Sequence, residues 1–228
     1  MKYWVLIFVF YAVFQVDPYA SERKRMVKHQ IEARGITHKA TLKAMYKVPR
    51  HHFVPKYMVT YAYEDRPLPI GNNQTISQPY IVAYMTATIS PKSGMKVLEV
   101  GTGSGYQAAV LAEIVDHVYT IEIIPKLAQK ATNTLDMLGY ENVTIRSGDG
   151  YLGWEEHAPF DAVIVTAALN HIPQPLIEQL KEGGSLVMPV GKHGEIQALK
   201  LLKKRRGKTT ENNLMAVRFV PFTGKQGK

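Results

Sequence analysis

A glycine-rich turn between an apolar run and a helical pattern constrains this sequence most. Residues 97–100 form a short, mainly apolar run, which is typical of a buried parallel strand. In residues 101–105 three glycines alternate with small polar residues, and residues 107–112 predict a helix. Glycine permits the backbone conformations of such a turn and lets a ligand lie against bare backbone. The helix start behind it offers unpaired N–H groups, so we expect a ligand on this turn.

The spacing of acidic residues after the turn indicates the kind of ligand. Further strands are predicted over residues 118–121, 143–145 and 160–165. Glu122 stands at the tip of the first of these, 21 residues after Gly101, where a carboxylate can accept hydrogen bonds from both ribose hydroxyls of a nucleoside. The glycines follow a GxGxG pattern rather than the GxGxxG of dinucleotide enzymes. This favours an adenosine ligand without a pyrophosphate, and S-adenosylmethionine (SAM) fits.

The 228 residues predict one domain, or one domain with extensions. There is no cysteine, which excludes disulfides and thiolate metal sites. The formal charge is +9, and much of it lies in two basic clusters over residues 23–28 and 200–208. Such charge attracts nucleic acid or acidic polypeptides, whereas the plainer interpretation is a solvated chain end and an exposed hairpin. No aromatic residue interleaves the second cluster, so we predict no specific nucleic-acid partner.

The N-terminus is apolar from Tyr3 to Val16 apart from Gln15. This stretch resembles a secretory signal peptide and is short for a transmembrane helix. The flank after it is more positive than the flank before it, which favours a downstream domain in the cytoplasm. We expect a cytoplasmic catalytic domain. Export to the periplasm and membrane contact through residues 3–16 stay open, and the oligomeric state is not predicted.

Residues 21–90 predict a helical extension. Helices are expected over residues 21–34, with Ser21 as N-cap and Gly35 as the end, over residues 37–47, and over residues 81–89. Residues 48–55 predict a proline-bounded loop and residues 65–71 an extended one. The loop's neighbouring histidines, His51 and His52, lack a third partner nearby, so no metal is predicted. Ser77 precedes the third helix, either as a plain N-cap or as a site residue.

The C-terminal part predicts the rest of a sheet. A helix over residues 175–181 is broken by Gly183 and Gly184, and a strand follows over residues 185–190. Strands over residues 197–204 and 214–220 form a hairpin. The chain after the fourth strand lacks the Asn/Asp-Pro-Pro-aromatic tetrad of enzymes that methylate bases. His171 in that stretch is expected to be a loop residue, with a general base as the alternative. The fold class is α/β, a doubly wound sheet with an antiparallel edge.

Several of these segments together are similar to one known family. The matching segments are residues 25–27, 30–31, 33–36, 48–51, 53–55, 62–71, 74–79, 99–106, 148–150 and 216–221. The most specific are Thr75-Ile76-Ser77-Gln78-Pro79 and Ala216-Val217-Arg218-Phe219-Val220-Pro221. Over residues 23–222 the chain resembles the protein-L-isoaspartate O-methyltransferase family. The apolar N-terminus departs from that pattern.

The resemblance implies a Rossmann-like, seven-stranded SAM methyltransferase sheet with a helical N-terminal extension and an antiparallel C-terminal strand pair. It implies methyl transfer from SAM to the free α-carboxylate of L-isoaspartyl residues in damaged proteins or peptides, leaving S-adenosylhomocysteine (SAH) and using no metal. Ser77 would be the catalytic residue and Glu122 would hold the ribose. The residues implied to bind the cofactor are Thr75, Ile76, Gly101, Thr102, Gly103, Ser104, Gly105, Glu122, Asp149 and Gly150; those implied to bind the substrate are Ser77, Val217 and Arg218. Arg218 as a plain surface charge is the alternative.

The chemistry of a carboxylate acceptor agrees with these residues. Carboxyl groups ionise at about pH 3 to 4, so the acceptor needs no general base. A hydroxyl such as that of Ser77 suits an orienting role. The expected divisions are an N-terminal segment (residues 1–20), the extension carrying Ser77 (21–90) and the SAM-binding core (91–228). The alternatives are a SAM methyltransferase of small carboxylic acids, a nicotinamide oxidoreductase and a non-catalytic basic binding module.

Overall fold

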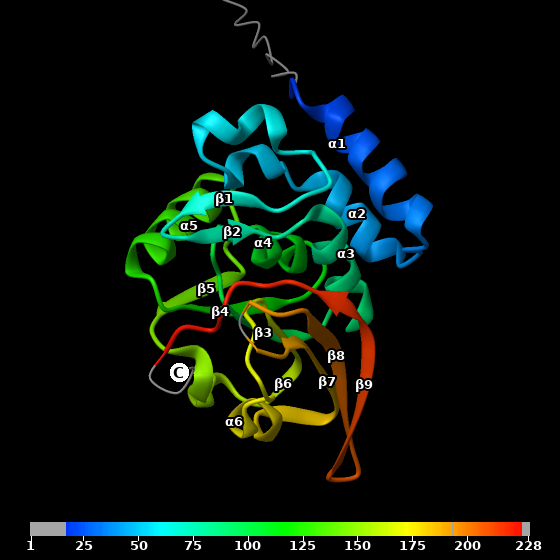
Figure 1. Cartoon of the computed structure of the whole chain (residues 1–228), viewed down its shortest axis with the longest axis vertical. Helices are drawn as coiled ribbons and strands as arrows, with labels where there is room; N and C mark the ends of the chain where they lie inside the picture. Colours follow the sequence, from blue (N-terminus) through cyan, green and yellow to red (C-terminus); the bar gives the residue numbers. More distant parts are fainter. Residues whose placement is uncertain (1–16, 193, 225–228) are drawn as a thin grey trace, which may run out of the picture.

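A seven-stranded sheet forms the centre of the molecule (Figure 1). The computed structural model describes residues 17–192 and 194–224. Along the sheet the strands lie in the order β5-β4-β3-β6-β7-β8-β9. Their bounds are β3 (Lys96–Val100), β4 (His117–Glu122), β5 (Val143–Ser147), β6 (Phe160–Val165), β7 (Leu180–Val190), β8 (Gln197–Arg205) and β9 (Lys208–Val217). Strands β3 to β7 pair in parallel, and β8 and β9 are antiparallel, which confirms the predicted fold class.

Helices bury both faces of the sheet. Along β3 the side chains alternate, so Val97 and Leu98 enter the apolar clusters of opposite faces. The cluster around Val97 includes residues of α3 (Pro79–Thr88) and α4 (Tyr106–Ala112). The cluster around Leu98 includes residues of α6 (Gln174–Glu178) and Trp154, which lies between the 3₁₀ turns η5 (Gly150–Leu152) and η6 (Glu155–His157). Burial on both faces explains why the central strands appear in the sequence as apolar runs.

The N-terminal elements pack over α4 and α5 (Pro125–Met137) (Figure 1). They are α1 (Ala20–Met26), a π turn η1 (Val27–Ile31), a 3₁₀ turn η2 (Glu32–Arg34), α2 (Lys39–Lys47), two further 3₁₀ turns η3 (Arg50–Phe53) and η4 (Lys56–Tyr61), and the hairpin β1 (Leu68–Gly71) and β2 (Gln74–Ile76). Their buried apolar residues join those of α4 and α5 in one cluster.

Several N-terminal predictions need correction. The first helix starts at Ala20 rather than after a Ser21 cap, because Asp17 accepts a hydrogen bond from the Tyr19 N–H instead. The second begins at Lys39, after His38, whose ring accepts from the Thr41 N–H. The loop predicted over residues 65–71 contains strand β1, which pairs with β2 through a turn with positive φ at Asn72 and Asn73. Asparagine tolerates that conformation better than most residues.

The loop over residues 48–55 also contains the 3₁₀ turn η3, and α3 covers residues 79–88 rather than 81–89. Gly35 ends the first helical stretch as predicted, with φ of 90°.

The C-terminal boundaries also differ from prediction. Helix α6 ends at Glu178, and β7 begins at Leu180, so Gly183 and Gly184 lie inside a strand rather than at a helix end. The β6–β7 register shifts between Phe160 and Ala162, beside these glycines. Strand β9 begins at residue 208 and ends at 217, because its polar first half pairs with the basic half of β8.

The apolar stretch of residues 3–16 lies outside the described residues. Within residues 17–192 and 194–224, no helix has both the length and the apolar character needed to cross a membrane.

Candidate functional site

The predicted turn leaves the carboxyl end of β3. Gly101, Gly103 and Gly105 have φ of 100°, 54° and 86°, all in the left-handed region that favours glycine. The N–H groups of Gly101 and Thr102 donate to the Ile121 carbonyl of β4, at 2.8 and 3.2 Å. The turn is therefore tied to the neighbouring strand, and residues 101–104 line a cavity.

That cavity, here called the first cavity, lies over the ends of β3, β4 and β6. The empty space in it is about 760 Å³, which includes space open to solvent. Most of the predicted cofactor residues line it, namely Thr75, Ile76, Gly101, Thr102, Gly103, Ser104, Glu122 and Gly150. The sequence therefore located the part of the lining that comes from the glycine turn, the tip of β4 and the end of β2, and not residues such as Glu99, Thr166 and Phe222.

Two predicted cofactor residues support the lining from behind. Gly105 faces α5, where an added β-carbon would lie 3.2 Å from the Leu135 side chain. The Asp149 carboxylate accepts from the Tyr151 N–H at 3.0 Å and so caps the turn that places Gly150 in the cavity wall.

Glu122 occupies the predicted position at the tip of β4. One carboxylate oxygen accepts from the Gly103 N–H at 2.7 Å and the other from the Ile124 N–H at 2.9 Å. The side chain is buried, at 5% exposure, and lines the first cavity. Two carboxylate oxygens offer about four acceptor positions, so this fixed carboxylate keeps capacity for a ligand's hydroxyl groups.

A second buried carboxyl, Glu99, was missed by sequence reasoning because it sits inside the apolar run. One oxygen accepts from the Thr120 hydroxyl at 2.5 Å, and Thr120 and Thr102 share a hydroxyl hydrogen bond of 2.6 Å. The other oxygen has no hydrogen-bond partner among the described residues. Burial raises the pKa of Glu99 to about 8, and the charge of Glu122 adds to this rise while the Thr120 hydrogen bond opposes it. Glu99 also lines the first cavity.

Ser77 follows β2 and is not a helix cap, since Gln78 is the N-cap of α3. The residue is half-buried and lines the first cavity. It also lines a second cavity between α3 and the end of β9. The residues that line both cavities are Thr75, Ser77, Thr166 and Val220. Ser77 therefore lies where the two cavities meet.

The predicted substrate residues Val217 and Arg218 line the second cavity. Val217 is buried at the end of β9, and Arg218 is exposed just beyond it. Arg34, from the N-terminal extension, lines the same cavity. Its guanidinium lies 3.4 Å from the centre of the Tyr80 ring and pairs with Asp65 at 2.9 Å. The structure thus brings the first helical stretch and the last strand to one cavity.

The walls contain residues for which the sequence gave no local signal. The Thr166 hydroxyl, just after β6, donates to the Gly101 carbonyl at 2.7 Å. The chain after β9, red in Figure 1, runs back from the edge strand toward the centre of the sheet. There Val220 and Phe222 hydrogen-bond to Ala168 through their backbones, at 2.9 Å each. Both segments were predicted only as strand ends, since their meeting depends on the folded chain.

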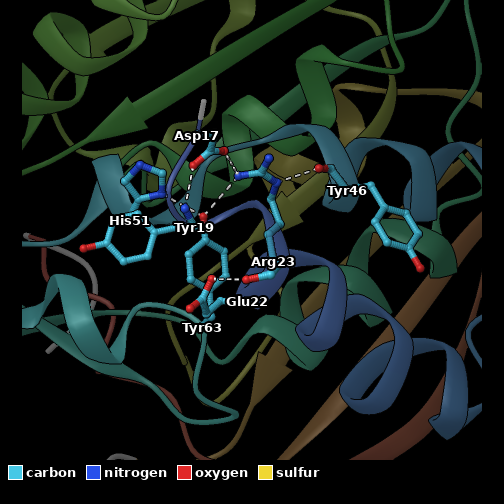
Figure 2. Close-up of polar contacts among 8 residues, drawn as sticks. Asp17, Tyr19, Glu22, Arg23, Tyr46, His51 and Tyr63 are labelled. Atoms are coloured by element: carbon cyan, nitrogen blue, oxygen red, sulfur yellow. Dashed lines mark hydrogen bonds and ion pairs between the residues drawn. The ribbon is translucent and has the colours of Figure 1, made fainter. Parts of the chain in front are cut away.

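The singled-out histidines lie outside both cavities. His171 is exposed and hydrogen-bonds to the Tyr151 hydroxyl at 3.0 Å. His51 hydrogen-bonds to the Tyr63 hydroxyl at 2.8 Å and lies against Tyr19, in the polar group drawn in Figure 2. Among the described residues, no group of three or more His, Cys, Asp or Glu side chains could hold a metal ion.

The basic clusters are partly used within the fold. Arg23 pairs with Asp17 at 2.6 Å and donates to the Tyr46 carbonyl (Figure 2). Lys204 donates to the carbonyls of Ile177, Glu178 and Leu180 at the end of α6. The remaining charge of the second cluster surrounds the β8–β9 turn.

Comparisons with known proteins identify the family of this chain. The model of the protein-L-isoaspartate(D-aspartate) O-methyltransferase family matches residues 21–227. The protein-L-isoaspartate O-methyltransferase of Opitutus terrae is 59% identical over 203 residues, which cover 89% of this chain and 87% of that protein. The Gloeobacter violaceus protein of the same name is 57% identical, covering 87% and 97%.

Solved structures give the same result. A protein-L-isoaspartate O-methyltransferase structure matches with a TM-score of 0.82 and 31% identity, covering 89% of this chain and 66% of that chain. A Plasmodium falciparum structure in complex with SAH has a TM-score of 0.75 at 23% identity, covering 91% and 99%, and shows the shared fold. This chain belongs to the protein-L-isoaspartate(D-aspartate) O-methyltransferase family.

Proposed function

We propose that this protein transfers a methyl group from SAM to the free α-carboxylate of L-isoaspartyl residues in damaged proteins and peptides. The observation that carries the proposal is the position of Ser77 at the junction of the two cavities. A methyl transfer needs a cofactor and an acceptor that meet at one point, and this junction provides such a point beside a hydroxyl donor.

The first cavity suits the cofactor. The bare backbone at Gly101 and Gly103 permits a close approach, and the fixed Glu122 carboxylate suits a pair of ribose hydroxyls. We assign Thr75, Ile76, Thr102, Ser104 and Gly150 to the walls of this site, with Gly105 and Asp149 holding it in shape. When bound, SAM supplies an electrophilic methyl group on a sulfonium.

The second cavity suits the acceptor peptide, with Val217 and Arg218 at its rim. The isoaspartyl carboxylate is already ionised at neutral pH, so the protein has no proton to remove. The Ser77 hydroxyl donates a hydrogen bond to one carboxylate oxygen and leaves the other directed at the first cavity. Holding cofactor and acceptor together in the reactive geometry can supply on the order of 7 to 11 kcal/mol of barrier reduction. Ser77 contributes to this by orienting the acceptor and does not attack.

Repair follows from the ester product. The backbone nitrogen that follows the residue attacks the ester carbonyl and expels methanol, which a free carboxylate does not permit, so the chain closes to a succinimide, whose hydrolysis returns some normal aspartate. We also propose that residues 21–90 form the extension that supplies Ser77, that residues 91–228 form the SAM-binding core, and that residues 1–20 are a separate N-terminal segment. Since SAM is made and held in the cytoplasm, we place the activity there.

Methyl transfer to a matched pair of peptides tests the proposal. The peptides differ only in one linkage, L-isoaspartyl or L-aspartyl, and methyl-labelled SAM reports the product. We expect only the isoaspartyl peptide to be labelled. Mild base should release the label as methanol, because the product is a methyl ester. Labelling of small carboxylic acids with no labelling of the isoaspartyl peptide would overturn the proposal.

A further inference from the structure

Arg50 is a fully buried arginine in the matching segment 48–51, and it lines neither of the two cavities. It begins the 3₁₀ turn η3, and none of its surface is exposed. Its Nε donates to the Ala62 carbonyl at 2.7 Å and its Nη2 to the Ser77 carbonyl at 2.8 Å. The guanidinium carbon lies 4.7 Å from the centre of the Tyr106 ring. The side chain therefore touches three chain segments that are far apart in the sequence.

A charge at this position is costly. Moving a charged group out of water carries a penalty of several kcal/mol, and here no carboxylate pairs with Arg50 in the described residues. Burial lowers the pKa of Arg50 to about 10, so the group still carries its charge at neutral pH. Its Nη1 makes no hydrogen bond among the described residues. An apolar side chain could fill this space, so the guanidinium indicates a role for its rigid, two-point donation.

The contacts of Arg50 join the two halves of the site. On one side it holds the backbone of Ser77, a residue that lines both cavities. On the other side it lies over Tyr106, the first residue of α4 after the glycine turn and part of the first cavity's wall. A single planar group thus fixes the serine relative to the turn.

We propose that Arg50 is a positioning residue for methyl transfer, which acts through the Ser77 carbonyl to set the place of the Ser77 hydroxyl relative to the cofactor-binding turn. This inference rests on the proposed function. Arg50 lines neither cavity. A misplacement of about 1 Å can cost on the order of 100-fold in rate, so loosening Ser77 lowers turnover without removing a binding group.

The test compares Arg50→Lys and Arg50→Met with the wild-type chain. Lysine keeps a charge but loses the rigid fork, and methionine keeps the bulk and loses both donors. We expect kcat for an isoaspartyl peptide to fall about 10-fold in R50K and about 100-fold in R50M. SAH affinity, measured by calorimetry, is expected to stay within threefold of wild type, because the cavity wall remains.

A double-mutant cycle separates positioning from a general loss of order. In a Ser77→Ala background the hydroxyl is absent, so R50K is expected to lower kcat by no more than about twofold. Equal losses from R50K with and without the Ser77 hydroxyl would overturn the inference. Loss of SAH affinity in proportion to kcat would also overturn it.

Arg146 provides a matched control. It also donates to a carbonyl, that of Gly153 at 2.6 Å, and lies over an aromatic ring, Trp154, at 4.4 Å, but it does not contact Ser77. We expect Arg146→Lys to keep kcat within twofold of wild type. If R50M does not fold, R50K decides; an R50K chain that is itself unfolded would assign Arg50 to folding alone and overturn the inference. A wild-type chain inactive on isoaspartyl peptides would instead contradict the proposed function.

Discussion

The Thr166 hydroxyl donates a hydrogen bond of 2.7 Å to the Gly101 carbonyl, and a β-carbon on Gly101 would lie only 2.3 Å from the Thr166 hydroxyl oxygen. The end of β6 therefore closes against the glycine turn at the end of β3. This contact joins two strands that are neighbours in the sheet and distant in the sequence. It fixes the backbone conformation at the first residue of the predicted cofactor turn.

Gly101→Ala is expected to damage both the turn and the cofactor site. The φ of Gly101 is 100°, which an alanine adopts only with strain, and its methyl group would meet Thr166. We expect SAH affinity, measured by calorimetry, to fall at least about tenfold, since a shift of 1.4 kcal/mol is enough for that change.

Gly139→Ala is the control. Its φ is 77°, and a β-carbon added there would meet no atom of another part of the chain within 4 Å. It should cost about 1 kcal/mol of stability and leave SAH affinity unchanged. Wild-type affinity in G101A would contradict this account.

Ser77→Ala is expected to separate turnover from cofactor binding. Loss of one hydrogen-bond donor aimed at the reacting group typically costs about 100-fold in kcat. The SAH dissociation constant should change less than threefold, because Ser77 forms only one edge of the first cavity. Ser93→Ala, an exposed serine that donates to Asp116, is the control and should leave kcat unchanged. If S77A lost SAH binding in step with kcat, the orienting role would be wrong.

The part of the fold that could be predicted is the part with a local pattern. Strands β3, β4 and β6 appear as mainly apolar runs because parallel strands inside the sheet are buried on both faces. Glu122 was placed correctly because the carboxyl ends of parallel strands meet at one edge of the sheet. The glycine turn could be predicted from the residues of the turn alone.

What could not be predicted depends on distant segments. Glu99 stands inside an apolar run, and its setting depends on Thr120 from the next strand. Arg50 stands in a proline-bounded stretch that was predicted as a loop, and only the fold shows that it is buried and donates to the Ser77 carbonyl. The segment predicted as an extended loop pairs with β2 through the turn at Asn72 and Asn73. The polar residues of this turn did not by themselves predict a hairpin.

Glu99 is expected to make the stability of the folded chain depend on pH. Its pKa is about 8 in the folded chain and 4.5 ordinarily, so the folded state holds a proton that the unfolded state releases between these values. Stability from this group is fully present below pH 4.5 and is lost as pH rises toward 8, by at most about 1.4 kcal/mol per pH unit.

Urea unfolding of wild type and Glu99→Gln at pH 5, 6, 7 and 8 tests this. Glutamine cannot ionise, so we expect the stability of E99Q relative to wild type to increase steadily over this range. Glu141→Gln, at an exposed site, is the control and should follow the wild type. A pH-independent difference between E99Q and wild type would show that Glu99 does not hold this proton.

Asp17→Asn is expected to weaken the attachment of α1. Figure 2 shows Arg23 between Asp17 and the Tyr46 carbonyl, with an Asp17–Arg23 distance of 2.6 Å. Burial alone would raise the pKa of Asp17, but the hydrogen bonds from the Tyr19 N–H and Arg23 outweigh it and lower the pKa below its usual 3.8. The carboxylate therefore stabilises the fold above pH 3.8, and this contribution is lost as pH falls through the lower, folded-state value.

Urea unfolding of D17N tests this. We expect the free energy of unfolding to be lower than that of the wild type by about 1 kcal/mol, equally at pH 7 and 5, and by less at pH 3. Asp136→Asn, on the exposed end of α5, should show no such loss. A D17N deficit that stayed the same at pH 3 would mean that the side chain contributes by its shape and not by its charge.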